Sequence, residues 1–175
     1  MTDQIEVERK WRLLKPLKDE WLNAFEPQLL TQAYILTDSG ELRVRTDGTS
    51  YWMTVKSDGT IARSEWEVEI PQWVFDQLLA ASEHIVTKNR YRVRGDMRSW
   101  EVDVYQGALA GLMIVEAEYF IREGKSEAEQ AETLAHIRAS RLYPGFGPAI
   151  EVTDDKRYKN KNLAVHGLPQ LEEES

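Results

Sequence analysis

Charged and apolar residues alternate one by one along most of this chain, and this pattern restricts its fold more than any other feature. The segment IEVERKWRL at residues 5–13 shows it first, with Glu6, Glu8 and Lys10 at every second position and Ile5, Val7 and Trp11 as their apolar neighbours. Side chains of a β-strand point alternately to its two faces, so these three charged residues share one face. The pattern predicts a strand whose charged face meets either solvent or a charged ligand.

Seven further segments repeat this period of two. The eight predicted strands cover residues 4–13, 30–37, 41–47, 50–56, 62–70, 86–94, 99–105 and 112–121. Short turn sequences such as DSG, DGTS, SDGT and RGDM separate several of them, and such short connections join antiparallel neighbours. We therefore expect an α+β fold that is mainly antiparallel β, arranged as a meander or a barrel.

Helices are expected to be a minority. The segment PQWVFDQLLAAS opens with Pro71 and spaces Trp73, Leu78 and Leu79 roughly along one helical face. The segment SEAEQAETLAHIRASRLY starts with Ser126 and carries Glu129 three residues later, which is the pattern of a capping box. A shorter helix is predicted around residues 16–25.

The bulk composition excludes several classes of protein. The chain has 175 residues, of which 42% are apolar, so one domain can bury a core; we predict this domain over 1–165 and an acidic tail over 166–175. Its lack of cysteine excludes disulfides, thiolate zinc sites and a cysteine nucleophile. The absence of a long apolar run or signal-peptide pattern predicts a cytoplasmic protein without a membrane partner. A net charge of −8 disfavours a nucleic-acid partner.

The charged faces of the strands are sorted by sign. A charged outer face is the ordinary expectation for any one antiparallel strand. Like charges side by side repel, however, so a face of one sign is unusual unless a ligand needs it. The basic faces carry Arg43 and Arg45, Lys56 beside Thr54, and Lys88, Arg90, Arg92 and Arg94; the acidic faces carry Glu65, Glu67 and Glu69, Glu101 and Asp103, and Glu116 and Glu118.

A polyphosphate bound with divalent cations is a ligand that needs both signs. Phosphate oxygens bind Arg and Lys, whereas Mg²⁺ and Mn²⁺ bind carboxylate oxygens. If the strands close into a barrel with these faces inward, both signs meet in one wet lumen, and helices cover the outside. The sequence contains no phosphate-binding glycine loop and no nucleophile-elbow serine motif, and its three histidines are scattered without metal-ligand spacing.

These residues resemble the CYTH, or triphosphate tunnel metalloenzyme, superfamily. Its E-x-E-x-K strand is matched by Glu6, Glu8 and Lys10. The family order continues through QAYIL, LRVR, MTVKS, ARSEWEVEI, VTKNRYRV, WEVDVYQG, GLMIVEAEY and EVTDDKRYKNKNLA, over roughly residues 1–165. The resemblance is strongest to the bacterial single-domain branch. It implies an eight-stranded, closed or nearly closed β-barrel with a few helices packed outside, which binds a triphosphate with Mg²⁺ or Mn²⁺.

The resemblance also implies roles for individual residues. The expected metal ligands are Glu6, Glu8, Asp103, Glu116 and Glu118. The expected phosphate-binding residues are Lys10, Arg43, Arg45, Lys56, Lys88 and Arg90. The catalytic candidates are Lys10, Tyr34, Glu65 and Glu67. Lys156 and the segment FGPAIEVT depart from the family pattern and leave the preferred triphosphate open, while Arg92 and Arg94 are expected at an exposed strand end.

The implied activity is metal-dependent hydrolysis of a triphosphate, with inorganic tripolyphosphate giving pyrophosphate and phosphate. Three alternatives stay open on the same fold: a class IV-type adenylate cyclase, a thiamine triphosphatase and a non-catalytic polyphosphate-binding module. An ordinary β-rich interaction domain has little support. Trp21 and Trp52 would either support a homodimer or belong to the core.

Overall fold

The computed structural model describes residues 5–37, 40–57, 65–94, 98–121 and 126–170. The chain divides into two compact units. Unit 1 comprises residues 1–27, 91–103 and 112–154, and unit 2 comprises residues 28–90, 104–111 and 155–175. Each unit is described by itself below, and the single domain expected over 1–165 stays a prediction.

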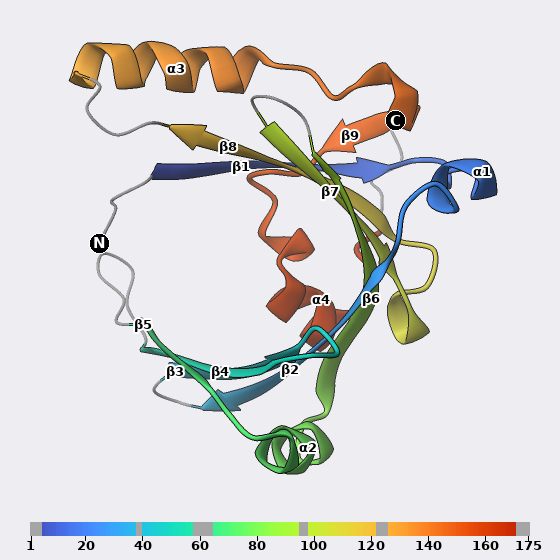
Figure 1. Cartoon of the computed structure of the whole chain (residues 1–175), viewed down its shortest axis with the longest axis vertical. Helices are drawn as coiled ribbons and strands as arrows, with labels where there is room; N and C mark the ends of the chain where they lie inside the picture. Colours follow the sequence, from blue (N-terminus) through green and yellow to red (C-terminus); the bar gives the residue numbers. More distant parts are fainter. Residues whose placement is uncertain (1–4, 38–39, 58–64, 95–97, 122–125, 171–175) are drawn as a thin grey trace. The chain divides into compact units, whose positions relative to one another are not determined.

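Nine strands are found in the described part of the chain, and eight of them overlap the predicted strands, whose residues 4 and 62–64 lie outside the described part (Figure 1). They are β1 (Ile5–Leu13), β2 (Gln28–Thr37), β3 (Gly40–Thr46), β4 (Tyr51–Ser57), β5 (Glu65–Glu69), β6 (His84–Arg94), β7 (Arg98–Tyr105), β8 (Met113–Ile121) and β9 (Ala149–Glu151). Hydrogen-bonded neighbours follow the order β5-β4-β3-β2-β6-β7-β8-β1-β9. The prediction of a mainly antiparallel β fold with few helices is confirmed.

The described residues form few helices. They are α1 (Asp19–Leu22), α2 (Gln72–Ala80), α3 (Glu127–Ala139) and α4 (Asn160–His166), with 3-10 turns at Gly107–Leu109, Pro144–Phe146 and Lys156–Tyr158. The capping box of α3 is present, because Ser126 Oγ accepts from the Glu129 N–H and the Glu129 carboxylate accepts from the Ser126 N–H. No helix in the described segments is long and apolar enough to cross a membrane. The acidic LEEES end lies outside the described residues.

An aromatic cluster forms the core of unit 1 on one side of β1. Trp11 of β1 and Trp100 of β7 have ring centroids 6.0 Å apart, and Phe146 lies 5.5 Å from Trp100. Trp21, at α1, completes the cluster with its ring 5.7 Å from that of Phe146. This packing places the half-buried Trp21 at the edge of the aromatic cluster, and it leaves the opposite face of β1 for Glu8.

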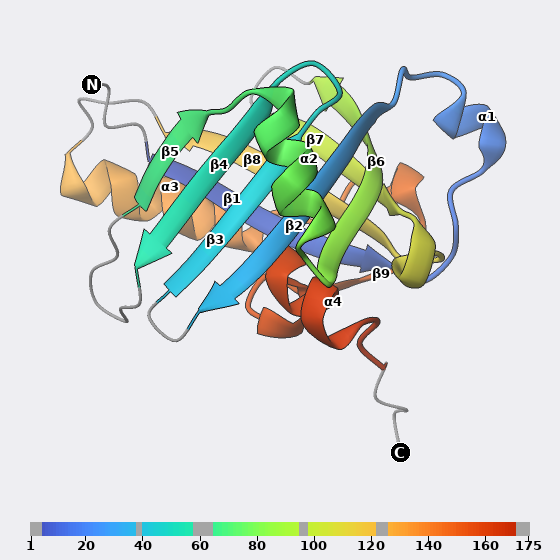
Figure 2. The same ribbon diagram turned by 90° about the horizontal axis from the view of Figure 1, so that it is seen from below.

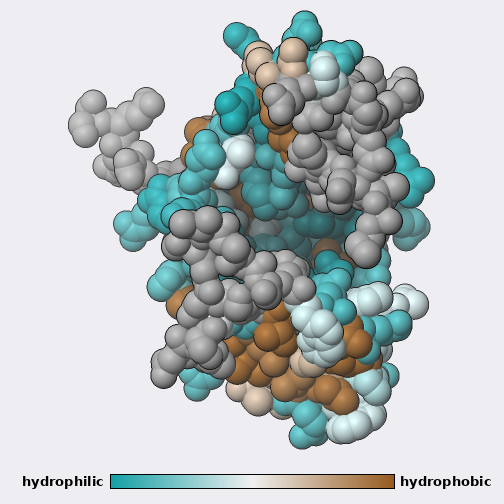
Figure 3. All heavy atoms as spheres, turned by 90° about the vertical axis from the view of Figure 1, so that its left-hand side faces the viewer, coloured by the Kyte–Doolittle hydropathy of each residue, from teal (hydrophilic) through white to brown (hydrophobic). Residues whose placement is uncertain are grey.

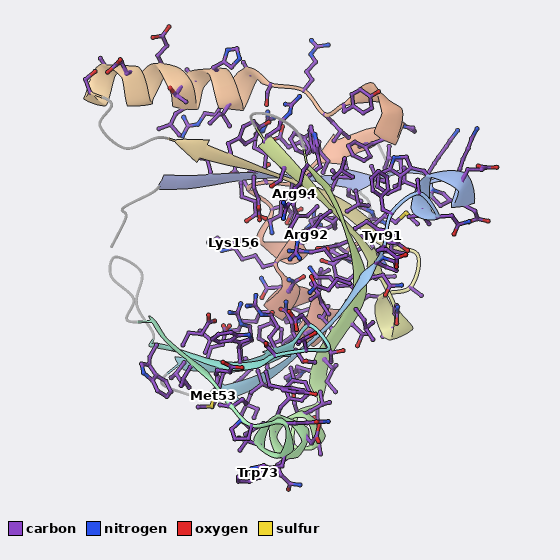
Figure 4. All side chains as sticks on the ribbon, viewed as in Figure 1. Met53, Trp73, Tyr91, Arg92, Arg94 and Lys156 are labelled. Atoms are coloured by element: carbon purple, nitrogen blue, oxygen red, sulfur yellow. The ribbon has the colours of Figure 1, made fainter. Side chains whose placement is uncertain are left out.

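In unit 2, helix α2 covers one face of β2, β3 and β4 (Figure 2). Phe75 of α2 is buried against Ala33 and Val44, with Leu78 and Leu79 packed beside it. The prediction that Trp73 shares this face is wrong: Trp73 is 69% exposed and points away from the sheet (Figure 4). Since a residue two positions before Phe75 lies on the far side of an α-helix, Phe75 takes the buried place.

The face of the unit 2 sheet on which α2 lies also carries an exposed group of apolar side chains (Figure 3). Trp66 of β5 and Val55 of β4 lie opposite each other in the strand register and are both exposed. The charged residues of these strands therefore point to the other face, because neighbours along a strand alternate.

Candidate functional site

Polar side chains form cross-strand rows on the face of unit 2 opposite α2. One row contains Tyr34, Arg43, Thr54 and Glu67; the next contains Gln32, Arg45, Trp52 and Glu69. Residues directly opposite each other in antiparallel strands share a face. Four predicted site residues, from β2, β3 and β5, are therefore brought together. Trp52 belongs to this polar face rather than to the apolar core.

Lys56 and Glu65 are opposite each other in the register of β4 and β5, in a third row with Glu41. The side chains of Lys56 and Glu65 lie outside the described part of the chain. Their predicted roles in phosphate binding and catalysis stay predictions.

Arg43 is held by its neighbours before any ligand binds. Its Nη2 donates to Thr54 Oγ1 at 2.9 Å and to Glu67 Oε2 at 3.2 Å. Thr54 Oγ1 in turn donates to Glu67 Oε2 at 2.7 Å. The Nε of Arg43 is buried and has no hydrogen-bond acceptor among the described residues. Because an unsatisfied buried donor is costly, this N–H is available to an anionic oxygen.

The same contacts set the protonation state of Glu67. The Thr54 hydrogen bond lowers the pKa of Glu67, and the charges of Arg45 and Arg43 act in the same direction, while burial opposes them. A carboxylate with a lowered pKa is a weak base. Glu67 is therefore better suited to orient Arg43 than to take a proton from water.

Tyr34 is buried, and its Oη donates to Gln32 Oε1 at 2.8 Å. Burial raises the pKa of Tyr34 well above the usual value of a tyrosine, so the phenol keeps its proton at neutral pH. In this state Tyr34 can donate a hydrogen bond to a phosphate oxygen but cannot act as a phenolate base.

Lys88 and Arg90 of β6 lie opposite Leu30 and Gln28 of β2, and so on the same face as Tyr34. Lys88 is fully buried, with Nζ 5.3 Å from the ring centroid of Tyr105. A buried ammonium must have compensating partners, and the aromatic face supplies part of this stabilisation. The predicted basic residues of unit 2 whose side chains are described, namely Arg43, Arg45, Lys88 and Arg90, thus share one face.

Helix α4 is attached to this charged face by contacts that were not predicted. Lys161 Nζ lies 2.8 Å from Glu41 Oε2 of β3, and Tyr105 Oη donates to Asn160 Oδ1 at 2.8 Å. Lys156, which departs from the family pattern, is exposed (Figure 4). The segment EVTDDKRYKNKNLA carries these residues, but it has no period that would predict which strand they contact.

The five predicted metal ligands belong to unit 1, and four of them lie on the paired strands β1 and β8. In the register, Glu8 lies opposite Glu118 and Lys10 lies opposite Glu116. Lys10 Nζ is 2.7 Å from Glu8 Oε1 and 2.7 Å from Glu116 Oε1. Three of the five predicted metal ligands are therefore close together on one face, with an ammonium group between two of them. Glu6 pairs with Phe120 in the backbone register, and its side chain lies outside the described part.

Strand β7 adds further groups to this acidic face. Ser99 Oγ donates to Glu118 Oε2 at 3.1 Å, so the residues that alternate with Ser99 point the same way. These are Glu101 and Asp103, and both are buried. Asp103 was predicted as a metal ligand, whereas Glu101 was recognised only as part of an acidic strand.

Arg92 was expected at an exposed strand end and is half exposed, but its Nε also donates to Glu101 Oε1 at 2.8 Å. Arg94 is exposed as expected (Figure 4). The pairing of Arg92 with a buried carboxylate brings another cation to the acidic face of unit 1.

The electrostatics of the Glu8–Lys10–Glu116 group follow from its burial. Burial and the nearby Glu116 raise the pKa of Glu8, and the charge of Lys10 only partly offsets this. Burial would lower the pKa of Lys10, but the carboxylates of Glu116 and Glu8 outweigh it, so the ammonium stays protonated. The described residues contain no group of three metal-binding side chains at ligand spacing. Lys10 occupies the place between two of the carboxylates.

A sequence model of the CYTH domain matches residues 4–158 of this chain. A curated relative, the inorganic triphosphatase of Nitrosomonas europaea, is 41% identical over 164 residues, which are 91% of this chain and 97% of the relative. The inorganic triphosphatase of Acetivibrio thermocellus is 29% identical over 149 residues, with 83% and 85% coverage. A crystal structure of an inorganic triphosphatase aligns with a TM-score of 0.65 at 38% identity, covering 92% of this chain and 95% of that one.

Proposed function

Because this chain belongs to the CYTH family, as its sequence resemblance predicted, we propose that it hydrolyses inorganic tripolyphosphate to pyrophosphate and phosphate. The two curated relatives are both inorganic triphosphatases and are matched over most of their length. Within the fold, the environment of the Arg43 guanidinium is the observation that supports the proposal most directly. This guanidinium is fixed by Thr54 and Glu67, and its buried Nε is left for an anionic oxygen.

The basic face of unit 2 would bind the phosphate chain. Arg43 and Arg45 offer planar guanidinium groups that match phosphate oxygens, and Lys88 offers a point charge. Tyr34, which keeps its proton, would donate a hydrogen bond to the terminal phosphate. Because these basic side chains are already held in place by their neighbours, less free energy is lost in orienting the phosphoryl group for attack by water.

The acidic face of unit 1 would bind a divalent cation. Carboxylate oxygens are the ligands that Mg²⁺ and Mn²⁺ prefer, and this face carries more carboxylates than ammonium groups. Glu8 and Glu116 already share one cation, the ammonium of Lys10, which supports the fit of this donor set. The residues that would hold the metal are Glu8, Asp103, Glu116 and Glu118, together with Glu6 as predicted from the sequence. When bound, the cation would offset the negative charge of the phosphates during transfer.

The protonation states assign separate tasks to two of the catalytic candidates. Glu67 would stay ionised and hold Arg43, and Tyr34 would stay protonated and donate. A preference for Mg²⁺ or Mn²⁺, a cytoplasmic location, a homodimer and the expected lack of a nucleic-acid partner stay predictions.

Substrate selectivity and one matched pair of variants test the proposal. The wild-type chain should release phosphate from tripolyphosphate faster than from ATP or pyrophosphate. Arg43→Met should lower kcat/KM for tripolyphosphate by about a hundredfold, since it removes a charged donor from the substrate. Arg157→Met removes the same charge from an exposed residue paired with Asp155 and should change kcat/KM by less than about twofold. Equal activity of the Arg43→Met and wild-type proteins would contradict the proposed binding of the substrate by Arg43.

A further inference from the structure

The ammonium of Lys10 lies between two carboxylates of unit 1. It contacts Glu8, two residues away on β1, and Glu116, directly opposite on β8, both at 2.7 Å. The Glu116 side chain is 7% exposed, and that of Lys10 is 23% exposed. The Glu8 side chain is 41% exposed, so water screens its charge in part, but a positive charge between the two carboxylates still offsets their repulsion.

The same two carboxylates are among the expected metal ligands. The point between them, within bonding distance of both, cannot hold an ammonium group and a divalent cation at once, because the two positive charges would repel and their volumes would overlap. Lys10 was expected to bind a phosphate oxygen. In the structure its nitrogen is instead engaged by the two carboxylates.

We propose that Lys10 is an internal counter-ion of the metal-free protein, and that a divalent cation displaces it from Glu8 and Glu116. The released ammonium then becomes available to a phosphate group. Metal binding thereby precedes and enables the phosphate contact of Lys10. The proposal rests on the proposed function to the extent that Glu8 and Glu116 are taken as metal ligands.

The backbone at Lys10 is fixed, so only the side chain has to move. The Lys10 N–H donates to Thr153 Oγ1 at 3.0 Å, and the Lys10 carbonyl accepts from the Val152 N–H at 2.9 Å. β1 is also paired with β8 from Ile5 to Arg12. A lysine side chain has four rotatable carbon–carbon bonds and can redirect its nitrogen without a change in the strand.

The displacement has a measurable consequence for metal affinity. A cation that must first displace Lys10 binds more weakly than it would to the same carboxylates without an ammonium between them. Lys10→Met keeps a side chain of similar length and removes the charge. Arg12→Met is the matched control, because Arg12 lies two residues further along β1 on the same face and the substitution removes the same charge.

The experiment is a calorimetric titration of the full chain with Mn²⁺ and, separately, with Mg²⁺, in the absence of phosphate. We expect Lys10→Met to bind Mn²⁺ at least about tenfold more tightly than the wild type, which corresponds to one lost charge-assisted hydrogen bond. Arg12→Met should bind Mn²⁺ within about threefold of the wild type, because the ammonium of Lys10, and not the guanidinium of Arg12, lies between Glu8 and Glu116.

Thermal unfolding gives a second readout that does not depend on activity. In chelator, Lys10→Met should have a lower Tm than the wild type, because Glu8 and Glu116 lose their shared cation. Saturating Mn²⁺ should then raise the Tm of Lys10→Met by more than it raises that of the wild type or of Arg12→Met. Lys10→Gln, which keeps a polar side chain, serves as the second neutral variant if Lys10→Met does not fold.

The outcomes separate this inference from the proposed function. Equal or weaker Mn²⁺ binding by Lys10→Met and Lys10→Gln, or equal tightening by Arg12→Met, would overturn the displacement of Lys10 and leave the metal site intact. A wild-type protein that binds neither Mn²⁺ nor Mg²⁺ would overturn both the metal site and the displacement.

Discussion

Replacing Arg9 by methionine should lower the free energy of unfolding by about 3 kcal/mol. Arg9 is buried in unit 1 on the face of β1 opposite Lys10, and it joins three segments. Its Nε donates to Glu151 Oε1 at 2.9 Å, and its Nη1 donates to the Ile137 carbonyl at 2.9 Å and to Ser140 Oγ at 3.1 Å. One side chain thus ties β1 to β9 and to the end of α3.

The magnitude follows from the exposure of each partner. A hydrogen bond to a charged group contributes about 1.5–3 kcal/mol, and removing one member of a buried ion pair costs about 3–5 kcal/mol. Glu151 is 42% exposed, so water can solvate its carboxylate once Arg9 is lost, and this reduces the cost. The Ile137 carbonyl loses a buried donor, which keeps the cost well above that of a surface pair.

Urea unfolding followed by tryptophan fluorescence measures this cost, since Trp11, Trp21 and Trp100 report on the core of unit 1. The double-mutant cycle of Arg9→Met with Glu151→Gln should give a coupling energy of about 1 kcal/mol or more. A loss below about 1 kcal/mol in Arg9→Met, or a coupling energy near zero, would refute this explanation of how α3 and β9 are held.

The pH dependence of this effect has a definite sign. The hydrogen bond from Arg9 lowers the pKa of Glu151, although burial opposes it. A carboxyl group whose pKa is lowered by folding stabilises the native state above its unfolded pKa, near 4.5, and this stabilisation disappears as the pH falls through the lower, folded pKa. The stability difference between wild type and Arg9→Met should be complete at neutral pH and shrink at acidic pH. A difference that is constant down to about pH 3 would contradict the assigned pair.

Three further predictions, made with four substitutions, test the basic face and the core of unit 2. Glu67→Gln should raise KM for tripolyphosphate about tenfold, because Arg43 loses its charged partner, and its kcat should change less; an unchanged KM in steady-state kinetics would oppose the positioning role. Tyr34→Phe should lower kcat without changing the pH profile of kcat between about pH 6 and 9, since the phenol does not ionise there; loss of a basic limb from that profile would show that Tyr34 titrates. Phe75→Ala should cost about 3–5 kcal/mol in chemical denaturation, whereas Trp73→Ala should cost less than about 0.5 kcal/mol; comparable losses would contradict the observed face of α2.

The strands could be predicted because each is long enough to show several alternations and is bounded by turn residues. Strand β9 could not, because Ala149–Glu151 has only three residues and offers no period. Its position depends on pairing with Trp11–Leu13, far away in the sequence. Helix α4 was missed for a similar reason, since Leu163 is its one buried residue in the described structure and one apolar position defines no helical face.

The sequence predicts which face of its strand each candidate site residue occupies, but it does not predict which residues of other strands that residue contacts. Alternation places Glu8 and Lys10 on one side of β1, yet it does not say which residue of another strand lies opposite. The register that sets Glu116 beside Lys10 joins positions 106 residues apart, and it depends on packing along the whole of β1 and β8. For the same reason, the pairing of Arg92 with Glu101 became visible only in the folded chain.

The measurement that tests the central claim most directly is phosphate release from tripolyphosphate by the wild-type chain with Mg²⁺, with Mn²⁺ and with chelator. The same assay should include Glu116→Gln, which removes one negative charge from the acidic face and leaves the basic face of unit 2 intact. We predict rapid release that requires a divalent cation and falls by at least about a hundredfold in Glu116→Gln. Release that is equally fast in chelator, or no release from tripolyphosphate with either metal, would contradict a metal-dependent triphosphatase.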